Sequence, residues 1–176
     1  MSTTKWTIDP THSEVGFKVK HMMVTNVSGR FKDITASIEN ATEDFETAHI
    51  SFSAQIESID TGNTDRDAHL KGADFFDAAQ FPSLNFTSTA IKALSDENYI
   101  VSGSLEINGT SKEIDLQVEI SEEMKDPWGN TKIGLAIHGV INRKDFGLTW
   151  NAALETGGVL VSEEVKLIAE VQFVKN

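Results

Sequence analysis

The segment from Asp60 to Phe86 holds the densest group of side chains that could do chemistry in this chain. Arg66, His69 and Asp74 lie there beside four phenylalanines, Phe75, Phe76, Phe81 and Phe86. One interpretation is structural, with the aromatic rings plugging one end of an apolar core. The other is a lid over an apolar ligand site, where Arg66, His69 or Lys71 contacts a polar head group. A plug explains the phenylalanines but not the cation at position 66 of an otherwise acidic stretch.

Neither histidine nor serine spacing indicates a reactive centre. The five histidines show no His-x-His or His-Glu-x-x-His pattern, and His69 has Asp65 one helical turn before it, which favours a helix-stabilising pair. No Gly-x-Ser-x-Gly motif or phosphate-binding glycine loop occurs. The absence of cysteine excludes disulfides, thiolate metal sites and cysteine nucleophiles. We therefore predict no catalytic residue, no metal and no cofactor. An enzyme with a lipid-like substrate, with His69 or His21 as first candidates, stays open as the alternative.

The charge of the chain restricts its partners. Fifteen basic and 27 acidic residues give a net charge of -12, which repels phosphate backbones and anionic membrane surfaces. We expect no nucleic acid partner. No apolar run approaches the length of a membrane span, and the first residues do not resemble a secretion signal. These features predict a cytoplasmic protein without stable membrane insertion.

Period-two alternation of apolar and polar residues predicts strands throughout the chain. Val15, Phe17 and Val19 show it clearly, and similar alternation recurs until eight strands are counted, at about 14–20, 30–39, 50–56, 84–93, 99–107, 113–120, 132–141 and 165–174. Turn signals between the runs, at 95–98, Asn108-Gly109, Trp128-Gly129-Asn130 and Gly157-Gly158, favour antiparallel neighbours.

Residues 61–80 form the one helical prediction, with Thr64 as N-cap and Asp67 three residues later. One short helix cannot cover eight strands, so the sheet must cover itself as an up-and-down barrel or a sandwich. Small residues on the apolar faces, at Ala54, Gly103, Gly139 and Ala169, leave open whether the interior holds a ligand cavity or is packed solid. A solid barrel would be a structural or interaction module.

Four stretches carry a resemblance to a known family, and they run in order along almost the whole chain. They read WTIDPTHSEVGFKVKH from Trp6, SIDTGNTDRDAHLKGADFFDAAQFPSLNFTS from Ser58, GSLEINGTSKEIDLQVE from Gly103 and RKDFGLTWN from Arg143. The chain resembles the YceI-like family of lipocalin-like, polyisoprenoid-binding proteins. The resemblance implies a single domain over 1–176, an all-β, eight-stranded antiparallel lipocalin-like barrel with a short helical lid, and a homodimer. It also implies a long isoprenoid lipid, such as an isoprenoid quinone or polyprenyl compound, held inside the barrel by a carrier, storage or sequestering protein.

Alternation and resemblance together select the candidate binding residues. Strict alternation turns Phe17, Phe52 and Phe86 inward, because a one-residue slip in register would expose them. Strands of about ten residues would enclose a tunnel on the order of 20–25 Å tall. We predict an apolar tunnel lined by Val15, Phe17, Val19, Phe52, Ala54, Ile56, Phe75, Phe76, Phe86, Leu105, Ile107, Ile137 and Trp150. The predicted head-group end consists of Asn63, Thr64, Arg66 and His69. Cations are so few at this end that we expect an uncharged head group.

Overall fold

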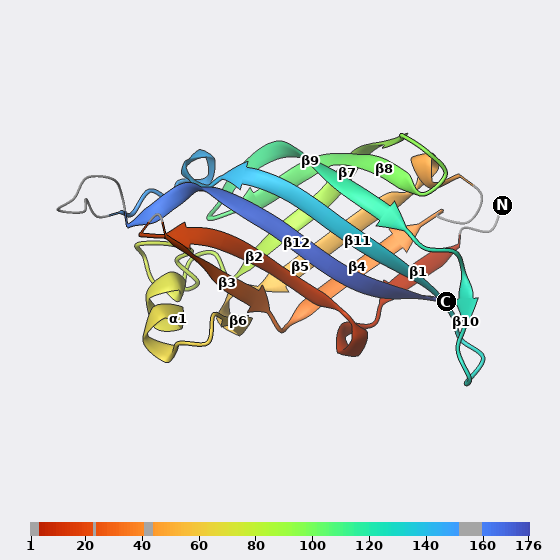
Figure 1. The fold of residues 1–176 in the computed structure, drawn as a ribbon, viewed down its shortest axis with the longest axis horizontal. Coiled ribbons are helices and arrows are strands. Elements are labelled where there is room, and N and C mark those ends of the chain that lie inside the picture. Colours follow the sequence, from red (N-terminus) through yellow and green to blue (C-terminus); the bar gives the residue numbers. More distant parts are fainter. Residues whose placement is uncertain (1–3, 23, 41–43, 152–159) are drawn as a thin grey trace.

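Eight antiparallel strand positions close into a barrel in the computed structural model, which describes residues 4–22, 24–40, 44–151 and 160–176 (Figure 1). This confirms the all-β, eight-stranded prediction. The alternation of apolar and polar residues predicted this fold correctly because each strand has one face toward the core and one toward water. The predicted Gly157-Gly158 turn lies outside the described residues.

Five of the eight positions are single long strands joined in sequence order around the barrel. They are β7 (Ser83–Ala93), β8 (Asn98–Ile107), β9 (Thr110–Ile120), β11 (Thr131–Asn142) and β12 (Val161–Lys175). β11 pairs with β12 from Lys132 to Asn142, and both strands keep strict register along this length. A short strand, β10 (Met124–Lys125), precedes β11 at one end of the barrel.

The other three positions are each broken into two strands. These pairs are β1 (Lys5–Ile8) with β2 (Glu14–His21), β3 (Thr25–Phe31) with β4 (Ile34–Glu39), and β5 (His49–Gln55) with β6 (Ile59–Asp60). The ladders show that the halves belong together: β1 and β2 both pair with β12, while β4 and β3 pair with β5 and β6. The run predicted over 30–39 therefore crosses a break at Lys32 and Asp33, and β1 was not predicted.

Asp9 fixes the break between β1 and β2. Its carboxylate accepts hydrogen bonds from the Thr11 backbone N–H at 3.2 Å, His12 Nδ1 at 2.8 Å and Lys132 Nζ at 3.1 Å, at the start of the 3-10 turn η1 (Pro10–His12). The hydrogen bond from His12, followed by those from the Thr11 hydroxyl and Lys132, holds the pKa of Asp9 below its ordinary value. The ionised side chain of Asp9 thus marks the place where the chain breaks between β1 and β2.

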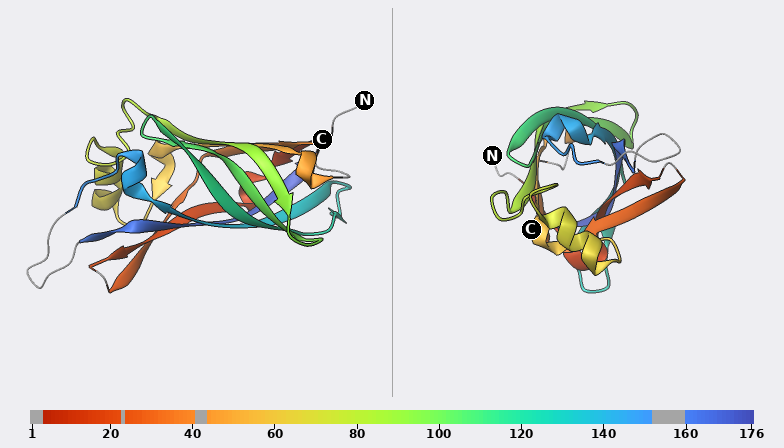
Figure 2. Two further views of the ribbon diagram at one scale, coloured as in Figure 1. Left: turned by 90° about the horizontal axis from the view of Figure 1, so that it is seen from above. Right: turned by 90° about the vertical axis from the view of Figure 1, so that its left-hand side faces the viewer.

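The helix lies at one end of the barrel, where the sheet is incomplete. Among the described residues no ladder joins β6 to β7, and the chain between them forms α1 (Thr64–Lys71) and the turns that follow (Figure 2). The helix is shorter than the predicted 61–80. Asn63, and not Thr64, is the N-cap, because Asn63 Oδ1 accepts from the Arg66 N–H at 2.9 Å.

A hydrophobic core fills the interior of the barrel. Trp6, Ile38 and Val101 are almost completely buried there, and they belong to one continuous hydrophobic cluster. All the residues predicted to face inward join this cluster or pack against it: Phe17, Phe52, Phe86, Leu105 and Ile137. Within the described residues, no helix is long and apolar enough to cross a membrane.

Candidate functional site

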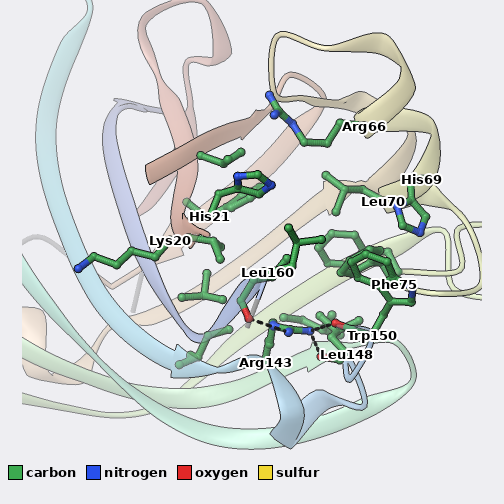
Figure 3. A pocket seen from close by; sticks show the side chains of 18 of the residues that line it. Lys20, His21, Arg66, His69, Leu70, Phe75, Arg143, Leu148, Trp150 and Leu160 are labelled. Atoms are coloured by element: carbon green, nitrogen blue, oxygen red, sulfur yellow. Dashed lines mark hydrogen bonds between the residues drawn. The ribbon is translucent and has the colours of Figure 1, made fainter. Parts of the chain in front are cut away.

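A cavity of about 450 Å³ opens at the end of the barrel that carries α1. We call it the mouth cavity (Figure 3). Aliphatic and aromatic side chains form most of its wall, from β2, β3, α1, β7, β8, β11, β12 and the segment after β11. Its lining residues are Phe17, Val19, Lys20, His21, Val27, Phe31, Asp65, Arg66, His69, Leu70, Phe75, Phe76, Leu84, Ile107, Ile141, Arg143, Leu148, Trp150, Leu160, Val161, Val165 and Leu167.

Aromatic rings from two distant parts of the chain form one wall of the mouth cavity. The His69 ring contacts Phe75 edge-on, with centroids 5.0 Å apart, and contacts Trp150 in the same way at 4.8 Å. The Phe75 and Trp150 centroids are 5.4 Å apart. His69 Nε2 lies 2.9 Å from Asp74 Oδ2, so the imidazole pairs with Asp74 instead of the expected Asp65. The turn after α1 brings Asp74 back toward the helix, which sequence spacing alone does not reveal.

Arg66 lies in the cavity wall with its guanidinium already engaged. Its Nε donates to Thr61 Oγ1 at 2.7 Å, and its Nη2 donates to the Thr61 carbonyl at 2.7 Å. The backbone N–H of Thr61 in turn donates to Asp67 at 2.9 Å. Arg66 therefore ties α1 to the end of β6, which explains a cation in this acidic stretch without a ligand.

Arg143 is the most buried charged residue of the wall, at 3% exposure, and its role is positioning. The guanidinium donates to four backbone carbonyls: those of Leu148, Trp150 at 2.9 Å, Val161 at 3.3 Å and Ser162 at 2.8 Å. Burial lowers the pKa of Arg143, and the nearby Glu163 carboxylate opposes that effect. Arg143 thus fastens the segment that carries Trp150 to the start of β12.

The structure brings only part of the predicted tunnel to the cavity. Phe17, Val19, Phe75, Phe76, Ile107 and Trp150 line it, as do Arg66 and His69 of the predicted head-group end. The other predicted residues do not line the cavity. Seven of them belong to the hydrophobic core or pack against it: Val15, Phe52, Ala54, Ile56, Phe86, Leu105 and Ile137. Asn63 and Thr64 are exposed. The cavity is therefore confined to the mouth half of the barrel and does not run along the whole predicted tunnel.

Small residues in the interior make room for protein side chains, which is why the tunnel is shorter. A Cβ at Gly103 would meet the Phe86 ring at 2.5 Å, and a Cβ at Gly139 would meet Leu116 Cδ2 at 2.6 Å. Ala54 is 0% exposed and does not border the cavity. The interior is therefore hollow toward the mouth and filled by side chains around Gly103 and Ala54.

The predicted tunnel and head-group end leave out several wall residues, and some of them carry a usable signal. His21 continues the alternation of Phe17 and Val19 on β2, so its inward position follows from period two. Arg143 has no such signal, because its four carbonyl partners come from a loop and a strand that only the fold brings together. Among the described residues, no group of three or more histidine, aspartate or glutamate side chains is arranged to hold a metal ion.

Comparison with known proteins places this geometry in context. A family model described as a YceI-like domain matches residues 6–173. A UPF0312 protein from Staphylococcus aureus strain N315 is 36% identical over 171 residues, which is 97% of each chain. The solved structure of a Campylobacter jejuni YCEI protein is 34% identical with a TM-score of 0.76, covering 96% of both chains. A structure described as a polyisoprenoid binding domain from Saccharophagus degradans shares the fold, with a TM-score of 0.72, 17% identity and coverage of 97% of this chain and 98% of that one.

Proposed function

Because this chain belongs to the YceI-like family, we propose that its mouth cavity binds an isoprenoid lipid and that the protein acts as a carrier, store or sequestering protein for it. The observation that carries the proposal is the cavity itself. It has about 450 Å³ of space and a wall of mainly aliphatic and aromatic side chains, a size within the range of small-molecule sites. Each methylene buried there contributes about 0.8 kcal/mol, so even a short isoprenoid segment supplies enough gross driving force for binding.

The relative described as a polyisoprenoid binding domain supports the choice of lipid class. The two arginines of the wall support an uncharged head group, such as that of an isoprenoid quinone. Arg66 and Arg143 already donate to protein oxygens, so a phosphate head would have to displace those bonds. A neutral head needs only one or two hydrogen bonds, and desolvating it costs far less than desolvating a charged one.

The cavity size has a consequence for the tail. A long tail cannot continue past the packed half of the barrel, so it must fold back inside the mouth cavity or extend out past the ring wall of His69, Phe75 and Trp150. We propose that the distal part of a long tail protrudes. This makes the mouth, and not the barrel length, the feature that sets which lipids are retained.

Extraction of the purified full-length protein with organic solvent, followed by mass spectrometry, tests the proposal. We expect an isoprenoid with a neutral head in near-equimolar amount. Fatty acids, phospholipids or no lipid in protein produced by a cell rich in isoprenoid quinones would overturn it. Adding a defined isoprenoid quinone to stripped protein and measuring quenching of tryptophan fluorescence gives a second readout, because Trp150 lies in the cavity wall.

A further inference from the structure

Positive charge is concentrated on one hairpin of this acidic protein. The segment 15–32, which forms most of β2 and all of β3, contains Lys18, Lys20, Arg30 and Lys32 and no aspartate or glutamate. The whole chain has a net charge of -12. The charge that a partner meets at this hairpin is therefore opposite in sign to the net charge.

Three lysines on the outer surface of this region are not neutralised by ion pairs. Lys18 on β2 stands directly opposite Lys166 on β12, and Lys20 points away from the cavity in Figure 3. Among the residues that the structure describes, no carboxylate lies within 4.0 Å of the amino groups of Lys18, Lys20 or Lys166. The two other basic residues of the hairpin are paired, since Asp60 lies 2.9 Å from Lys32 and 4.0 Å from Arg30. On β12, Glu164 and Lys166 face the same outward side because they are two residues apart. The free cations are therefore those nearest the hairpin tip.

The tip of the hairpin is apolar and exposed. Met22 is 48% exposed and Val24 is 80% exposed. The backbone N–H of Met22 donates to the Leu160 carbonyl at 2.7 Å, and Leu160 lines the mouth cavity. Val19, His21 and Val27 of the same hairpin also line it. An apolar tip with cationic flanks therefore stands at the rim of the cavity, at the end of the barrel seen in the right-hand view of Figure 2.

The opposite end of the barrel offers a natural comparison. There the turn between β10 and β11 exposes Trp128 at 83% and Met124 at 69%. The residues around this second tip include Glu122, Glu123 and Asp126 against Lys125 and Lys132, so acidic residues outnumber basic ones there. Exposed apolar groups occur at both ends, and Lys125 at this second tip also has no ion pair among the described residues, but acidic neighbours outnumber the cations here, whereas the segment 15–32 contains no acidic residue.

We propose that the β2–β3 hairpin docks the mouth of the barrel onto the surface of an anionic phospholipid bilayer. Screening at physiological salt has a length of about 8 Å, so the hairpin lysines interact with the surface while the acidic residues at the far end of the barrel do not. Met22 and Val24 enter the interface, and Lys18 and Lys20 contact lipid phosphates. Each signal is weak, so docking is reversible, as a protein that collects or delivers a lipid requires. The docking itself does not depend on the lipid-binding proposal, although that proposal gives it a purpose.

Sedimentation with vesicles tests the docking. The full-length protein is mixed with vesicles of phosphatidylcholine alone or of phosphatidylcholine with phosphatidylglycerol. We expect binding to the anionic vesicles only, weakening as salt is added. Lys18→Gln with Lys20→Gln should weaken binding by about 25-fold, at roughly fivefold per lysine. Met22→Ser with Val24→Ser should weaken it several-fold. The matched control, Met124→Ser with Trp128→Ser at the opposite tip, should bind like the unaltered protein.

The outcomes separate this proposal from the lipid-binding one. Equal binding to neutral and anionic vesicles, unchanged binding by the hairpin variants, or loss of binding in the Trp128 control would overturn the docking. If the hairpin binds a partner protein and not a bilayer, the protein will sediment with neither kind of vesicle, and this result would also overturn the docking proposal. The isoprenoid content of each purified variant is measured in parallel. Lipid content without vesicle binding would refute docking alone, and vesicle binding without isoprenoid would refute only the proposed function.

Discussion

The ring of Phe86 on β7 lies over Gly103 on the neighbouring strand β8, so close that a Cβ at Gly103 would meet Phe86 Cζ at 2.5 Å and the Thr87 carbonyl oxygen at 2.5 Å. Phe86 also stands directly opposite Leu105. Two residues toward the mouth on the same two strands, Leu84 and Ile107 line the cavity. Phe86 and Leu105 thus form part of the floor on which the cavity ends.

Removing the Phe86 ring should deepen the cavity. We expect Phe86→Ala to lower the free energy of unfolding by about 3–5 kcal/mol, because a buried ring is lost and a void remains. The deeper cavity should also protect more of a bound isoprenoid tail, measured as slower release of lipid to acceptor vesicles. Faster release with the same loss of stability would contradict a floor at Phe86.

Tryptophan substitutions at three positions should separate the cavity, the packed core and the outer surface. Val19→Trp fills the mouth cavity, so it should abolish lipid retention at little cost in stability. Ala54→Trp overpacks a site that is 0% exposed, and should lower stability by about 1–3 kcal/mol or more. Val140→Trp changes an outward residue that is 59% exposed and serves as the control. Urea unfolding and lipid extraction of the three variants check the pattern. Full lipid content in Val19→Trp would place the ligand elsewhere.

Arg143 should be a residue of stability and not of head-group recognition. Arg143→Gln leaves several buried carbonyls without donors, so we expect a loss of about 3 kcal/mol or more in urea unfolding. Arg143→Lys should restore only a small part, because one ammonium cannot reproduce the planar guanidinium fork. Full rescue by lysine would mean that charge alone matters here. Lys144→Gln is the control, since Lys144 pairs with Glu163 at 2.7 Å on the surface.

Retention of lipid should be insensitive to salt if the head group is uncharged, because screening weakens only attraction between charges. Arg66→Gln should then leave the lipid content nearly unchanged, although it loosens the contact between α1 and Thr61. The measurement is lipid extracted after washing at low and high salt. A steep loss of lipid with salt, together with loss in Arg66→Gln, would show that a phosphate head is held. Vesicle docking, by contrast, should weaken with salt in the same experiment.

Asp9 should make stability depend on pH at the acid end. Its folded pKa is depressed, so its contribution is fully present above the unfolded value of about 4 and is lost as pH falls toward the folded pKa. Asp9→Asn should therefore destabilise the protein near neutral pH, and its deficit relative to the unaltered protein should shrink at about pH 3. Urea unfolding at the two pH values measures this. A deficit that does not change with pH would mean that the Asp9 carboxylate stabilises the break through shape and not through charge.

Much of the fold is local information, which is why it could be predicted. The alternation of Phe17 and Val19 with Lys18 and Lys20 assigns each strand an inner and an outer face. Turn signals such as Asn108-Gly109 join neighbouring strands, and Asn108 and Gly109 both have the positive φ that this turn needs. The positions of the strand breaks could not be predicted in the same way. Asp9 sets one of them through Lys132, a partner far away in the sequence.

The amino-acid sequence by itself determined an eight-stranded barrel of the YceI-like family with an apolar interior, because a period of two residues and short turns are properties of neighbouring residues. Only the tertiary structure decided where the interior is hollow. Whether Gly103 leaves a void or receives a ring depends on Phe86 across the sheet, and whether Arg143 is free for a ligand depends on carbonyls from β12 and the preceding segment. Volumes and hydrogen bonds are settled between residues that meet only when the barrel closes.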